Sequence, residues 1–133
     1  MTIEPSQAVI RAIGTGAVIV SLATWGMDLF GIVGPCGYCR AQRSVIGILG
    51  IIALLPTVSH WFMQYVSRVL AAFGVVVAAT QHFNAWNDIS KGKFVFQWRL
   101  YENSFLLSGA ALFIIVGLIL VIAAIAHPQA ARP

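Results

Sequence analysis

Charged residues are scarce in this chain of 133 residues, since only 9% are Asp, Glu, Lys or Arg and only four of them are acidic. The mean hydropathy is +0.88 and 59% of the residues are hydrophobic, more apolar surface than a water-soluble domain of this length can bury. The composition therefore excludes a soluble enzyme and predicts an integral membrane protein surrounded by lipid. The few basic residues form no stripe with interleaved aromatic side chains, so we expect no nucleic-acid partner.

Cysteine and histidine are also rare, with two cysteines and three histidines in the whole chain. A metal centre built on the cysteines would need two further ligands, and His82 is the one obvious candidate on the same side of the membrane. We therefore predict no metal site. Internal repeats, low-complexity tracts and linkers are lacking as well, which indicates one domain over residues 1–133.

Four apolar stretches divide the chain: Val9 to Val33, Ser44 to Pro56, Val69 to Ala79, and Phe105 to Ala126. The outer two reach the roughly 20 residues that a spanning helix needs, whereas the middle two must include flanking polar residues. The pattern predicts an all-α fold, a four-helix transmembrane bundle with both termini on one side. A short segment around Lys93 to Tyr101 partly alternates polar and apolar residues, which predicts an interfacial segment between helices three and four.

The sequence also predicts where the second and third helices begin and end. Helix two is expected to begin near Tyr38, and Thr57 to Arg68 is expected to form the turn that follows it. Helix three would then run to about Phe83, followed by a long loop to Ser104.

The two cysteines provide the clearest chemistry, in the run Pro35-Cys36-Gly37-Tyr38-Cys39 at the mouth of helix two. A Cys-x-x-Cys pair is typical of a redox-active dithiol. Arg43 stands one helical turn after Cys39, where a guanidinium could stabilise a thiolate and donate hydrogen bonds to a carbonyl ligand. This combination suggests electron exchange between the thiol pair and a quinone, with a structural disulfide as the alternative.

The motif, its place in a four-helix chain and the following Gln42-Arg43 step resemble the disulfide bond formation protein B (DsbB) family, quinone-dependent oxidants of the bacterial cell envelope. The resemblance implies that Cys36 and Cys39 are the catalytic pair and that the cofactor is ubiquinone or menaquinone. It also implies that Arg43, Gln42 and His82 bind the quinone.

The chain departs from that family because it has no cysteine in the loop between helices three and four. Family members use a second pair there to pass oxidising equivalents to a thioredoxin-like periplasmic protein. Three functions therefore stay open. The first is a thiol:quinone oxidoreductase, and the second is a quinone-binding or anchoring subunit of a larger membrane redox complex with structural or vestigial cysteines. The third is a generic four-helix packing or assembly protein.

Two signals in the sequence give opposite orientations in the membrane. Five basic residues flank the cysteine side against three on the terminal side, which favours a cytoplasmic cysteine loop. A disulfide persists only in an oxidising compartment, however. We therefore expect a multi-pass protein of the bacterial inner membrane with a periplasmic cysteine loop.

Two further features carry hypotheses. Asp28 is an ionisable residue near the end of helix one, and it could be either functional or simply solvated. Ala12 and Gly16 form a pair of small residues that could allow close helix packing.

Overall fold

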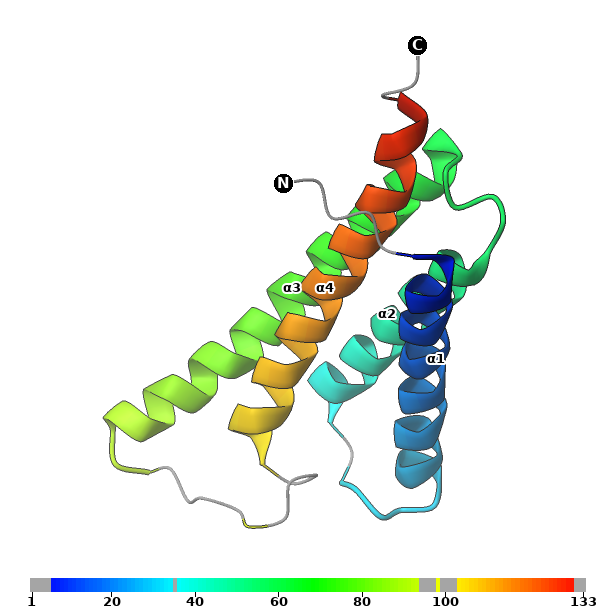
Figure 1. The fold of residues 1–133 in the computed structure, drawn as a ribbon. Coiled ribbons are helices and arrows are strands. Elements are labelled where there is room, and N and C mark those ends of the chain that lie inside the picture. Colours follow the sequence, from blue (N-terminus) through cyan, green and yellow to red (C-terminus); the bar gives the residue numbers. More distant parts are fainter. Residues whose placement is uncertain (1–5, 35, 94–97, 99–102, 131–133) are drawn as a thin grey trace.

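The computed structural model describes residues 6–34, 36–93, 98 and 103–130, with only the backbone described for 127–130. These residues form four helices, α1 (Gln7–Leu29), α2 (Gly37–Leu54), α3 (Trp61–Ser90) and α4 (Ser104–Ala130), as drawn in Figure 1. The predicted all-α fold is confirmed at this level.

The helices run up and down, so that the start of α1 and the end of α4 lie at one end of the bundle (Figure 1). The turn between α1 and α2, which leads to the cysteines, lies at the opposite end. α1 packs along α2 and α3 packs along α4, while α2 also contacts both α3 and α4. α1 and α4 barely touch. We call the end that carries Cys36 and Cys39 the cysteine end.

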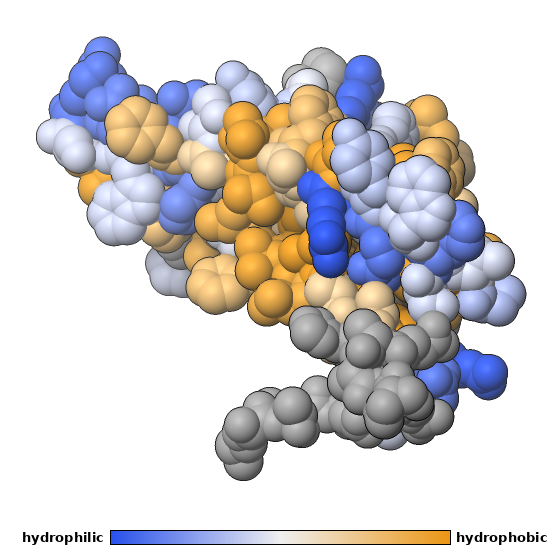
Figure 2. Space-filling model, turned by 90° about the horizontal axis from the view of Figure 1, so that it is seen from above, coloured by the Kyte–Doolittle hydropathy of each residue, from blue (hydrophilic) through white to orange (hydrophobic). Residues whose placement is uncertain are grey.

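Three of the described helices are long and apolar enough to cross a membrane: α1, α3, and α4 over Ser104–Ala126. α2 is not among them, because its first half carries two arginines and a glutamine, at Arg40, Gln42 and Arg43. Large apolar side chains such as Phe113 and Leu22 face outward on the other helices. Apolar side chains also form much of the surface seen from above in Figure 2, which fits contact with lipid.

α3 is longer than the sequence predicted. The expected turn at Thr57 to Arg68 is helical from Trp61 onward, and the expected loop after Phe83 is helical up to Ser90. The prediction was wrong because polar residues were taken as markers of helix ends. Gln64, Ser67 and Gln81 are instead buried inside the bundle. The predicted interfacial segment falls largely on residues 94–97 and 99–102, which lie outside the described part of the chain.

Glycine ends both helices that lead into the loops of the cysteine end. Gly31 has φ +71° and Gly92 has φ +70°, a left-handed conformation that costs residues with a Cβ atom. After α1, the amides of Gly31 and Ile32 donate to the carbonyls of Asp28 and Met27, the pattern of a Schellman motif. This motif ends α1 at Leu29 and directs the chain toward α2.

The core lies between α2, α3 and α4. Its largest fully buried apolar side chains are Leu49 of α2 and Ile115, Leu118 and Ile122 of α4. α3 faces them with small residues, and a Cβ atom at Gly74 would lie 2.8 Å from Val45 Cγ1. The small side chains therefore let α3 approach its neighbours closely, as is common between membrane helices.

The contact between α1 and α2 is equally close. Gly14, Ala17 and Ser21 on α1 are buried against Gly47 and Gly50 on α2. The small-residue pair expected at Ala12 and Gly16 is not the contact, because both residues are exposed on α1. The hydroxyl of Ser21 also donates to the carbonyl of Arg43 (2.7 Å), which ties the two helices together.

Gly50→Ala should lower the stability of the bundle. A Cβ atom there would lie 2.9 Å from Ala17 Cβ and 3.0 Å from the carbonyl oxygen of Gly14, and that backbone cannot retreat easily. We expect a loss of roughly 1–3 kcal/mol, measured as thermal unfolding in detergent by circular dichroism.

Gly26→Ala on α1 is the matched control, since a Cβ atom at Gly26 meets nothing within 4 Å. Its higher helix propensity should leave stability unchanged or raise it by up to about 1 kcal/mol. Equal unfolding temperatures for the two variants would contradict the packing described here.

Candidate functional site

The two cysteines lie side by side at the start of α2. Cys36 is the N-cap residue, and its sulfur accepts a hydrogen bond from the amide of Cys39 (3.3 Å). The two Sγ atoms are 2.7 Å apart, and both cysteines are free thiols. The two side chains therefore point toward each other at the start of α2.

A carboxylate on α1 forms an ion pair with two arginines of α2. Asp28 Oδ2 accepts from Arg40 Nε and from Arg43 Nη1, both at 2.8 Å, and Asp28 Oδ1 accepts from Arg40 Nη2 (3.0 Å). The Asp28 side chain is 4% exposed, against 49% for Arg40 and 13% for Arg43. Of the two roles considered for Asp28, simple solvation is therefore excluded.

Arg43 is held by groups of α1 on one side of its guanidinium. Besides Asp28, its Nη1 donates to the carbonyl of Thr24 (3.0 Å), and the guanidinium carbon lies 5.7 Å from the ring centre of Trp25. Within the described part of the chain, no hydrogen bond joins Arg43 to either sulfur. To the residues that the structure describes, Arg43 donates only through Nη1, which leaves the Nε and Nη2 donors for another acceptor.

Two buried amides, those of Gln42 and Gln81, form a chain of hydrogen bonds that ends at the sulfurs. Gln42 Nε2 donates to Gln81 Oε1 (2.7 Å), and this contact joins α2 to α3. Gln81 Nε2 in turn donates to Cys39 Sγ (3.7 Å) and lies 4.0 Å from Cys36 Sγ. The sulfurs are thus approached by an uncharged donor.

A cavity of about 500 Å³ brings these groups together. Cys36, Cys39, Gln42, Arg43 and Gln81 all line it. Its other walls come from α1 and α4 and include Ser21, Thr24, Met27, Leu107, Ala111 and Ile114. The volume lies in the range of small-molecule sites, and the lining combines an apolar wall with a few polar groups, as such sites do.

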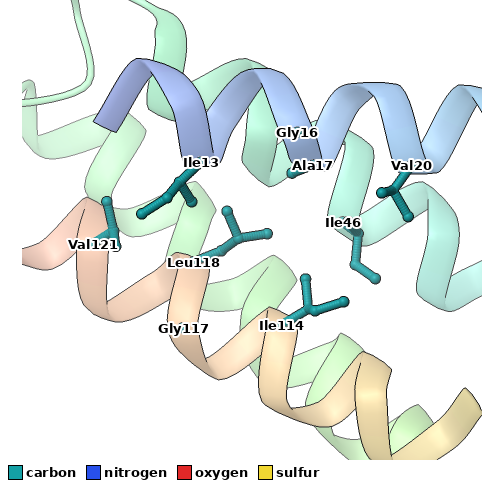
Figure 3. Close-up of a pocket in the computed structure, with 9 residues that line it drawn as sticks. All are labelled: Ile13, Gly16, Ala17, Val20, Ile46, Ile114, Gly117, Leu118 and Val121. Carbon is teal, nitrogen blue, oxygen red and sulfur yellow. The ribbon is translucent and has the colours of Figure 1, made fainter. Parts of the chain in front are cut away.

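An apolar groove of about 350 Å³ lies between α1 and α4. Figure 3 shows its side chains, with Ile13 and Val20 from α1 facing Ile114, Leu118 and Val121 from α4. Val20, Ile46 and Ile114 line both the groove and the cavity, so the two spaces adjoin. The groove exists because α1 and α4 make so little contact.

His82 does not belong to this site in the structure, although it was expected to bind a quinone. It is not among the residues that line the cavity. Trp86 Nε1 donates to its Nε2 (3.1 Å), so Nδ1 carries the ring proton and donates to Ser108 Oγ (3.0 Å). Phe105 lies against the ring, with 4.6 Å between centroids. These partners make His82 a contact between α3 and α4.

Of the predicted site residues, the structure brings together Cys36, Cys39, Gln42 and Arg43. Sequence reasoning missed Gln81, which directly precedes His82 and therefore faces a different side of α3. A glutamine inside an apolar stretch is visible in the sequence, but the sequence does not say which side of α3 faces the cysteines. The described residues hold no cluster of three or more metal-binding side chains.

Comparison with protein-family models, with curated proteins and with solved structures found no match to this chain.

Asp28→Asn should destabilise the cysteine end, because it leaves two guanidinium groups without a compensating charge. We expect an unfolding temperature in detergent lower by about 5 °C or more. Arg40→Gln alone should have a small effect, since that side chain is half exposed. In the double variant Asp28→Asn/Arg40→Gln, the removal of Arg40 should recover part of the lost unfolding temperature. An additive result in this double-mutant cycle would contradict the shared ion pair.

Proposed function

We propose that this chain is a membrane thiol:quinone redox protein in which Cys36 and Cys39 cycle between dithiol and disulfide. The observation that carries the proposal is that two adjacent sulfurs line one cavity with a pre-oriented arginine. In this reaction the thiols lose two electrons and two protons as their sulfurs join, and a quinone takes up both to become a quinol. The proposal agrees with the DsbB resemblance of the cysteine motif and the Gln42-Arg43 step.

The residues around the cavity suit a quinone headgroup. The Nε and Nη2 donors of Arg43 are suited to a carbonyl oxygen, and Asp28 holds the guanidinium so that little ordering is needed on binding. The apolar wall formed by Leu107, Ala111 and Ile114 would cover a ring face. This arrangement supports Gln42 and Arg43 as binding residues and offers no role to His82.

The adjoining groove suits the other half of a membrane quinone. Isoprenoid tails are apolar, and all nine residues that line the groove are apolar. A tail between α1 and α4 would extend from the cavity along the side chains drawn in Figure 3. A ubiquinone or a menaquinone would fit this description equally well.

A second candidate function follows from the cysteine count. Because the chain has only two cysteines, thiol exchange with a partner must occur directly at Cys36 or Cys39 or through cysteines of another subunit. A quinone-binding subunit of a larger membrane redox complex meets this condition. Co-purification in mild detergent with other redox subunits, retained in Cys36→Ser, would favour it. Multiple turnover of a reduced thioredoxin-like protein by the isolated chain would favour the oxidoreductase.

We also propose that the cysteine end faces the periplasm of a bacterial inner membrane. Cys36→Ser leaves Cys39 as a single thiol, and we expect a membrane-impermeant maleimide to label it in intact cells. Labelling only after lysis would reverse the orientation.

Arg43→Lys should weaken quinone binding by about tenfold, because lysine keeps the charge but loses the planar fork of donors. The measurement is calorimetric titration of the purified protein in detergent with decylubiquinone. Arg68→Lys, on an exposed position of α3, is the control and should bind as the unchanged chain does. Unchanged affinity of Arg43→Lys, with helicity retained, would remove Arg43 from the binding site.

A further inference from the structure

The two glutamines beside the cysteines, Gln42 and Gln81, are buried polar residues in an apolar bundle. Gln42 is 4% exposed and Gln81 is 8% exposed, and they come from different helices. A buried amide that lacks hydrogen-bond partners destabilises the folded protein. Among the described residues, Gln42 donates to Gln81, and Gln81 in turn donates to Cys39 Sγ and lies 4.0 Å from Cys36 Sγ.

The hydrogen bond between the amides fixes which end of Gln81 meets the cysteines. Gln42 donates through Nε2, so the oxygen of Gln81 is occupied and its NH₂ group is turned toward the sulfurs. A hydrogen bond from an NH₂ group favours a negatively charged sulfur over a protonated one. The amide itself brings no charge into the bundle, unlike lysine or arginine, whose insertion at this depth is costly.

Arg43 is less suited to stabilising a negatively charged sulfur, although it carries a full positive charge. Its guanidinium is compensated by Asp28 and makes no hydrogen bond to either sulfur. The donor to the cysteines therefore comes from α3 and the arginine remains available to a ligand. Cys39 is the nearer of the two sulfurs to Gln81, at 3.7 Å.

We propose that Gln81 is the hydrogen-bond donor that stabilises the thiolate of the cysteine pair, and that Gln42 is the positioning residue that turns the donor side of Gln81 toward the sulfurs. The proton leaves the thiol to solvent or to a base before the sulfur acts as a nucleophile, and no electrons move in this step. This inference rests on the proposed function in one respect, because it takes the cysteine pair to undergo a redox cycle.

The test measures alkylation of the reduced protein by iodoacetamide as a function of pH, followed by mass spectrometry. Thiolate is the species that reacts. Gln81→Met keeps the size of the side chain and removes the donor. We expect its rate–pH profile to move to higher pH and its rate at pH 7 to fall about tenfold. An unmoved profile in the folded variant would overturn the proposal.

Gln42→Leu provides an independent test in a chain that keeps Gln81, and it adds no charge beside the thiols. Without an amide at position 42 to occupy the carbonyl oxygen of Gln81, the NH₂ group of Gln81 is no longer held toward the sulfurs. The rate should therefore fall as in Gln81→Met. An alkylation profile equal to that of the unchanged chain would show that Gln42 does not orient the donor, and would overturn its assigned role.

Gln64→Met is the matched control, because Gln64 is also a buried glutamine of α3. It lies at the opposite end of the bundle, where its Nε2 donates to the carbonyls of Val58 (2.7 Å) and Ile122 (3.0 Å). This variant should lose thermal stability and keep the alkylation profile. A shift equal to that of Gln81→Met would mean that the effect is structural. Because no quinone is added, this experiment can succeed even where the quinone titration fails.

Discussion

Two arginines enter the bundle with α2, and a single carboxylate of α1 forms an ion pair with both of them. The cysteine end depends on this ion pair, because an uncompensated guanidinium with 13% of its side chain exposed would be costly at a membrane boundary. Asp28 stands two residues before α1 reaches its C-cap at Phe30, so the Schellman turn at Gly31 and the ion pair lie at the same level. Together they fix the ends of α1 and α2 and thereby shape the cavity between them.

The sequence was informative where a signal was local. The end of α1 before its glycines, the cysteine motif at the start of α2 and the grouping of Gln42 and Arg43 with the cysteines all depend on residues close together in the chain. The structure agrees with each of them. The cysteine pair, its separation and the helical turn to Arg43 needed no tertiary information.

Features that depend on contacts between distant segments could not be obtained in this way. Gln81 reaches Gln42 across 39 positions, and nothing in its neighbourhood distinguishes it from His82 as the residue that faces the cysteines. The length of α3 was underestimated for the same reason, since burial of Gln64 and Gln81 is decided by what packs on them. The packing face of α1 likewise falls on Gly14, Ala17 and Ser21, because α2 offers glycines opposite those positions.

Because α1 and α4 make little contact, a lipophilic molecule can reach the groove between them from the side. A space that opens sideways between two membrane helices exchanges its contents with the bilayer, so its occupancy follows the mole fraction of a lipophile among the lipids and not its concentration in water. Adding more lipid to the same bilayer would then lower the occupancy of the groove even though the aqueous volume and the total amount of lipophile stayed the same. Diffusion within the plane of the membrane would set the rate of exchange.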